Sequence, residues 1–106
     1  MTTIYGIDTE KEVTPIMVRD AILECFFKAH CYDTGIAEDN SGSTREYCNE
    51  LVQKAFADAG ANFINPSKDD LLKVIEGLAV FSRNFRDQEI VAKHFAEIQG
   101  LIDLTK

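Results

Sequence analysis

The stretch that decides the fold is residues 15–32, PIMVRDAILECFFKAHCY. Apolar residues recur in it at helical spacing, so it predicts one long helix. One apolar side of this helix comprises Val18, Ala21, Ile22, Cys25, Phe26, Ala29 and Tyr32. A second apolar stripe comprises Ile16, Leu23 and Phe27. An arc facing solvent is left to Met17, Asp20, Glu24, Lys28 and Cys31. The helix is therefore apolar over about twice the width that is usual for a surface helix.

A helix with two apolar stripes must be covered from more than one side, because an exposed patch of that size is unusual on a soluble monomer. The helix is expected to be the most central of the fold or one shared between two molecules. We favour a homodimer in which the second stripe, Ile16, Leu23 and Phe27, forms the interface. The alternative is that an N-terminal arm, residues 1–13, covers the stripe with Ile4, Tyr5 and Ile7.

The rest of the chain predicts three further helices, at about 43–59, 66–82 and 86–103, because apolar residues again recur at helical spacing. In the third of these segments the apolar face comprises Leu71, Leu72, Val74, Ile75, Leu78, Ala79 and Phe81. The boundaries rest on cap signals: Thr14-Pro15 and Gly35, Ser43 with Glu46, Gly60, Asn65-Pro66, and Asn84 with Asp87. The prediction is an all-α, four-helix bundle forming a single domain over residues 14–106, preceded by the arm.

Composition narrows the class of partner. The chain has 106 residues and a net charge of −7, spread along its length. Such a surface disfavours nucleic acid and anionic membranes as partners, because phosphate binding depends on Lys and Arg. No segment is long and apolar enough to predict a membrane span or a signal peptide. The three cysteines form no CxxC pair, so free thiols in the cytoplasm are expected.

Three residues are candidates for a site in the core. His94 falls within the apolar face of the last helix, and Cys25 and Cys48 face the predicted core. Together they have the ligand types of a Cys₂His zinc site, although their spacing matches no metal signature. The structural interpretation is a buried, hydrogen-bonded histidine and two cysteines that act as small apolar residues, and we favour it.

Two further features of the sequence are the loop 33–42 and Gly77. The long polar loop 33–42 has room for a site, although its residues do not fit the register of a calcium-binding loop. Gly77 lies inside a predicted helix, where glycine costs about 1 kcal/mol relative to alanine. A close approach of another backbone to Gly77 is therefore expected.

The residues show no resemblance to a known family and no arrangement suited to catalysis or to a cofactor. The sequence therefore predicts a small non-enzymatic cytoplasmic protein that acts through protein–protein contacts as a homodimer. The alternative is a regulatory protein that binds a small molecule or a metal at a core site near His94, Cys25 and Cys48.

Overall fold

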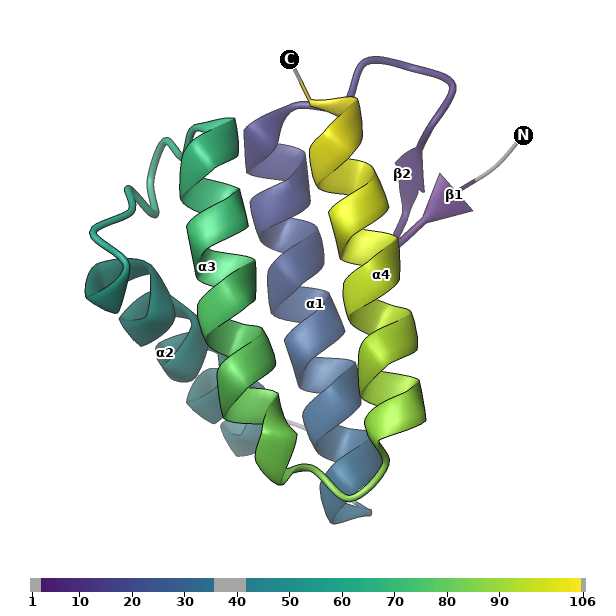
Figure 1. Ribbon diagram of the computed structural model, residues 1–106, viewed down its shortest axis with the longest axis vertical. Helices are drawn as coiled ribbons and strands as arrows, with labels where there is room; N and C mark the ends of the chain where they lie inside the picture. The colour runs from purple at the N-terminus through teal and green to yellow at the C-terminus, as the bar shows by residue number, and fades with distance from the viewer. Residues whose placement is uncertain (1–2, 36–41, 106) are drawn as a thin grey trace.

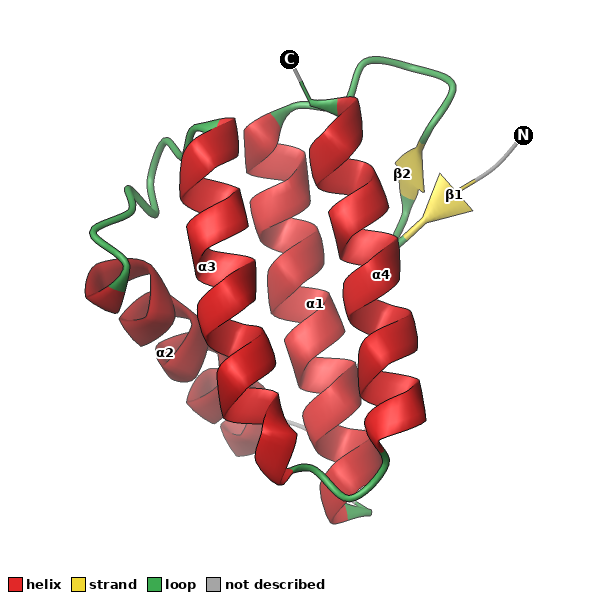
Figure 2. Cartoon of the chain, viewed as in Figure 1, coloured by secondary structure: helices red, strands yellow, loops and turns green. Residues whose placement is uncertain are grey.

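The computed structural model describes residues 3–35 and 42–105 of the chain. Its elements are β1 (Thr3–Ile4), β2 (Ile7–Asp8), α1 (Pro15–Thr34), α2 (Gly42–Asp58), α3 (Lys68–Phe81), the short 3₁₀ helix η1 (Ser82–Asn84) and α4 (Gln88–Leu104). The four α-helices pack against one another, so the prediction of an all-α bundle is confirmed (Figure 1). Among the residues that the structure describes, β-strands occur only in the short N-terminal hairpin (Figure 2).

The first helix is the central one, as one reading of its two apolar stripes predicted. It packs against α2, α3 and α4, and α3 in turn packs against α2 and α4 (Figure 1). Its buried residues are Val18, Ala21, Ile22, Cys25, Phe26, Phe27, Ala29 and Cys31. The width of the apolar surface is therefore explained largely by three helical neighbours within the same chain.

The predicted interface stripe on α1 is not a continuous surface of the folded chain. Phe27 has no exposed area, and the guanidinium of Arg45 on α2 lies 3.9 Å from the centre of its ring. Leu23 is only partly exposed and packs against the core, whereas Ile16 remains 43% exposed. The expectation of an interface through Phe27 is corrected, because α2 already covers that side chain.

The N-terminal arm covers a different face from the one expected. Tyr5 and its neighbours in the hairpin lie beside Met17, Asp20 and Lys28, which belong to the arc predicted to face solvent. The same arc was predicted to include Cys31, yet Cys31 is 3% exposed and the adjacent Tyr32 is 56% exposed. A helical wheel gives the angle between two side chains but not which neighbour covers each side of the helix. The predicted burial of Cys31 and Tyr32 is therefore the reverse of what is observed.

The arm itself is a β-hairpin. Thr3 pairs with Asp8 and Ile4 with Ile7, and the two residues between them, Tyr5 and Gly6, both have positive φ (51° and 77°). A two-residue loop with positive φ at both positions is the type I′ geometry, which matches the twist of a hairpin. A left-handed conformation costs a non-glycine residue about 1 kcal/mol or more, so the contacts of the Tyr5 side chain must offset it.

Two of the predicted helix ends are confirmed by their hydrogen bonds. The Thr14 hydroxyl accepts from the backbone N–H of Met17, and Pro15 occupies the first turn of α1. Gly35 ends α1 in the left-handed conformation (φ 75°), and its N–H donates to the carbonyl of Cys31. Gly60, just after α2, also has positive φ (67°). Glycine tolerates this conformation without the steric cost of a Cβ.

Three predicted caps are wrong. Ser43 lies inside α2, which begins at Gly42. Ser67, not Asn65, caps α3, because its hydroxyl accepts from the N–H of Asp70 while the Asp70 carboxylate accepts from the N–H of Ser67. The second of these bonds lowers the pKa of Asp70. The cap of α4 is Asp87, whose carboxylate accepts from the N–H of Ile90, whereas Asn84 belongs to η1.

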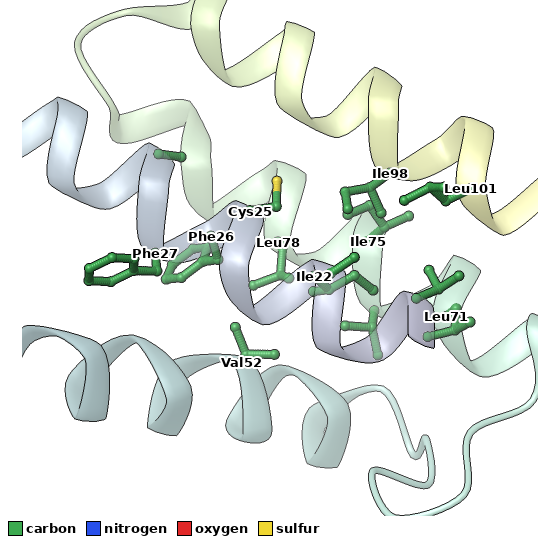
Figure 3. Close-up of a cluster of buried hydrophobic side chains, with 14 of the residues drawn as sticks. Ile22, Cys25, Phe26, Phe27, Val52, Leu71, Ile75, Leu78, Ile98 and Leu101 are labelled. Carbon is green, nitrogen blue, oxygen red and sulfur yellow. The ribbon is translucent and has the colours of Figure 1, made fainter. Parts of the chain in front are cut away.

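The core is formed by side chains from all four α-helices, which meet around α1 (Figure 3). Val52 of α2 points toward α1 from one side, and Ile98 and Leu101 of α4 approach from the other (Figure 3). The largest fully buried side chains include Phe26, Phe27, Phe56, Ile22, Leu71 and Ile98. The hairpin adds Ile7, which is 6% exposed, to this core.

Candidate functional site

The hairpin is fixed to the helices through a small polar cluster around Tyr5. The Tyr5 hydroxyl lies 2.5 Å from Nδ1 of His94 on α4 and hydrogen-bonds to it. The Nζ atom of Lys28 on α1 lies 5.5 Å from the centre of the Tyr5 ring. The fully buried thiol of Cys25 also lies near Tyr5, which is one of the groups that influence the pKa of this thiol. Two of the three predicted site residues, His94 and Cys25, are thus brought to one side chain that the sequence did not single out.

The chemistry of this cluster is that of a structural contact. Burial raises the pKa of the Cys25 thiol to about 12, and it also raises the pKa of Tyr5. A thiol must ionise to act as a nucleophile or a metal ligand, so burial holds Cys25 in its unreactive form at neutral pH. The arrangement matches the structural interpretation of His94 as a hydrogen-bonded histidine. His94 is, however, partly exposed.

The third predicted site residue lies elsewhere. Cys48 is on α2, and burial raises the pKa of its thiol to about 11. Cys31 adds to this rise and Arg45 opposes it. Within residues 3–35 and 42–105, no group of three or more His, Cys, Asp or Glu side chains is placed to hold a metal ion. The predicted set of His94, Cys25 and Cys48 is therefore not assembled. Most of loop 33–42, the other segment considered for a site, lies outside the described residues.

A hollow with a volume of about 560 Å³ lies on the described surface between α2 and α3. We call it the α2–α3 groove. The apolar residues that line it are Phe26, Leu51, Ala55, Ala59, Leu78, Val80 and Phe81. Val80 and Phe81 are large apolar residues with high exposure, 57% and 42%. A predominantly apolar hollow of this size suits either a small ligand or a side chain of a protein partner.

The charged residues along the groove balance one another. Lys54 and Asp58 come from α2, and Lys73 and Glu76 come from α3. The groove therefore carries two positive and two negative side chains, although the whole chain has a net charge of −7. Like-charge repulsion opposes contact between two copies over most of the surface, and the groove is a region where it is absent.

One end of the groove joins a cluster of aromatic rings. The ring of Phe81 lies 5.8 Å from that of Phe26 and 6.1 Å from that of Phe85. His30 lies between Phe85 and Tyr47 in tilted ring contacts, with ring centroids 6.3 and 5.5 Å apart. Tyr47, at the far end of this cluster, is 50% exposed.

The other end of the groove is set by the link between α2 and α3. Arg19 of α1 donates hydrogen bonds to the backbone carbonyls of Phe63 and Ile64, at 2.9 and 3.2 Å, and lies 5.0 Å from the centre of the Phe63 ring. Phe63 also packs edge-on against Phe56 of α2. These contacts hold the link between α2 and α3 against α1.

Gly77 faces the groove and leaves backbone exposed there. The sequence predicted a close approach of another backbone at this residue. Within the described chain, however, a Cβ added to Gly77 would meet no atom within 4 Å. The expectation is thus wrong for contacts inside this chain. The glycine instead deepens an open part of the groove, at a cost to the stability of α3.

Comparison of the chain with protein-family models, with curated proteins and with solved structures gave no match. No helix in the described part of the chain combines the length and the hydrophobicity that crossing a membrane requires.

Proposed function

We propose that this protein is a small non-enzymatic interaction protein that works as a homodimer, with the α2–α3 groove at its interface. The observation that carries the proposal is the groove itself, an apolar hollow flanked by the exposed side chains of Val80 and Phe81. Burial of apolar area is the main driving force for most protein association. The proposal keeps the homodimer that the sequence predicted but moves its interface from α1 to α2 and α3.

A second copy is the occupant that the charges favour. A dimer with two-fold symmetry buries the same patch on both copies, so the patch must be complementary to itself. Lys54 and Lys73 supply positive partners for Asp58 and Glu76 of another copy, and the groove as a whole is neutral. A strongly basic or strongly acidic partner would find no such match.

We place this activity in the cytoplasm. No disulfide links Cys25, Cys31 or Cys48 within the described residues, which suits a reducing compartment. The buried thiols and the Tyr5–His94 contact are assigned to stability and not to catalysis, since burial raises the pKa of Cys25 and Cys48.

The test is the mass of the protein in solution, measured by size-exclusion chromatography with light scattering. We expect wild-type protein to have twice the chain mass of 11.9 kDa. Val80→Asp should be monomeric, because a charge would be buried in the interface without a partner. Val80 is 57% exposed, so the substitution leaves the fold of the single chain intact.

The matched control is Ile16→Asp, at a residue of the stripe that the sequence assigned to the interface and that is 43% exposed. We expect this variant to remain a dimer. A monomeric wild type would contradict the proposed function. A dimer that is lost with Ile16→Asp and kept with Val80→Asp would show that the interface lies on α1.

A further inference from the structure

The α2–α3 groove has both halves of a self-complementary contact on one helix. Gly77 and Phe81 are four residues apart on α3, so they lie on the same face and about 6 Å apart along the axis. Gly77 offers a gap in the side-chain layer, and Phe81 offers a large ring that is 42% exposed. A gap and a knob at this spacing can fit each other in an antiparallel pair of helices.

We infer that the groove of each copy is occupied by Phe81 of the other copy, which enters at Gly77. This inference rests on the proposed homodimer and specifies its geometry. In an antiparallel pair of α3 helices related by a two-fold axis between these residues, each Phe81 lies opposite the Gly77 of its partner. The two-fold symmetry makes both contacts at once, so the dimer contains two copies of the same interaction.

The surroundings of Gly77 support entry of an aromatic ring. Ala55 of α2 and Ala59, just after its last residue, also line the groove, and both have short side chains that leave it wide. Leu51 and Leu78 supply apolar contact within it. Large aromatic residues that fill a pocket at the centre of an interface are the residues that most often dominate binding energy. The cost of glycine within α3 is thereby linked to a function in the dimer.

The test is to fill the groove at Gly77 without disturbing the monomer. A Cβ at Gly77 meets nothing within 4 Å, and leucine favours a helix more than glycine does. Gly77→Leu should therefore fold at least as well as wild type. We expect it to weaken the dimer by more than about tenfold in Kd, the effect of losing a central contact. Sedimentation equilibrium over a dilution series measures this Kd.

The matched control is Gly100→Leu. Gly100 lies within α4, is exposed, and also has no atom within 4 Å of an added Cβ. We expect this variant to dimerise like wild type. Phe81→Ala should weaken the dimer to a similar degree as Gly77→Leu, because each removes one half of the same contact. The double variant should then be little weaker than either single variant.

The outcomes separate the inference from the proposed function. A wild-type dimer that is unaffected by Gly77→Leu, or affected equally by Gly100→Leu, overturns the inference and leaves the homodimer in place. A wild-type protein that is monomeric throughout the series overturns both. If that monomer binds the apolar dye anilinonaphthalene sulfonate and Gly77→Leu abolishes the binding, the groove takes a small apolar ligand instead.

Discussion

The side of the bundle formed by α1 and α4 is closed by the chain itself, whereas the side formed by α2 and α3 is left open. On the first side the hairpin lies over α1, and Tyr5 links it to His94 and Lys28. On the second side no corresponding segment of the described chain fills the α2–α3 groove, and Val80 and Phe81 stay exposed. An apolar helix surface can thus be covered within the chain, so the pattern of apolar residues in the sequence does not by itself locate an interface.

The largest difference between the two sides should appear in the stability of the monomer. Phe27→Ala removes a fully buried ring and should lower the free energy of unfolding by about 3–5 kcal/mol. Phe81→Ala removes a ring that is 42% exposed and should cost much less. Urea denaturation at concentrations where the protein is monomeric measures both. Equal losses would show that Phe81 belongs to the core and not to an open surface.

Alkaline pH should destabilise the protein through its buried thiols. Burial raises the pKa of Cys25 to about 12 and that of Cys48 to about 11, from a usual value near 9. Above pH 9 the unfolded chain loses these protons while the folded chain keeps them, so stability falls until the folded groups ionise. Denaturation followed from pH 8 to 11 should show this fall, which Cys25→Ala should reduce. If the stability of Cys25→Ala depended on pH in the same way as that of wild type, the raised pKa of Cys25 would be contradicted.

The hairpin should loosen when its hydrogen bond to α4 is removed. Tyr5→Phe keeps the ring and its contact with Lys28 but deletes the hydroxyl that bonds to His94. We expect a loss of about 1 kcal/mol in the free energy of unfolding, the net value of one such bond. Hydrogen exchange of the Ile4 and Ile7 amides should become faster by a larger factor than exchange in α3, which follows only the global loss of stability. An equal or larger increase in α3 would contradict a local role of the bond.

The smallest effect concerns glycine in the helices. Gly77→Ala and Gly100→Ala should each stabilise the monomer by up to about 1 kcal/mol, because alanine favours a helix and an added Cβ meets no atom within 4 Å at either position. Thermal unfolding of the monomer measures the two changes. A destabilised Gly77→Ala monomer would show that the groove is more closely packed than described.

The helices could be predicted from sequence because their spacing and caps are local properties. Thr14, Gly35 and Gly60 act as predicted, and each predicted boundary lies within two residues of the observed one. The caps of α3 and α4 were misplaced because Ser67 and Asp87 compete with the nearby Asn65 and Asn84 for the same role. Which of two nearby polar residues caps a helix depends on where the preceding loop places the backbone.

The surfaces could not be predicted because they depend on contacts between distant segments. Phe81 was assigned to the buried face of the third helix, yet it is 42% exposed and lines the α2–α3 groove. The link between α2 and α3 is also held by a distant residue, because Arg19 binds it at Phe63 across 44 positions of sequence. The hairpin was not expected because Tyr5 adopts a positive φ that its residue type rarely takes.

One NMR experiment on the wild-type protein compares the two sides of the bundle and locates the interface. Methyl NMR spectra of wild-type protein over a dilution series report each side chain separately. We predict that the methyl signals of Val80 and Leu51, in the groove, shift with concentration, while those of Ile7 and Ile16 stay constant. Signals that shift at Ile16 and not at Val80, or that do not shift at any of these residues, would contradict the assignment of the interface to α2 and α3.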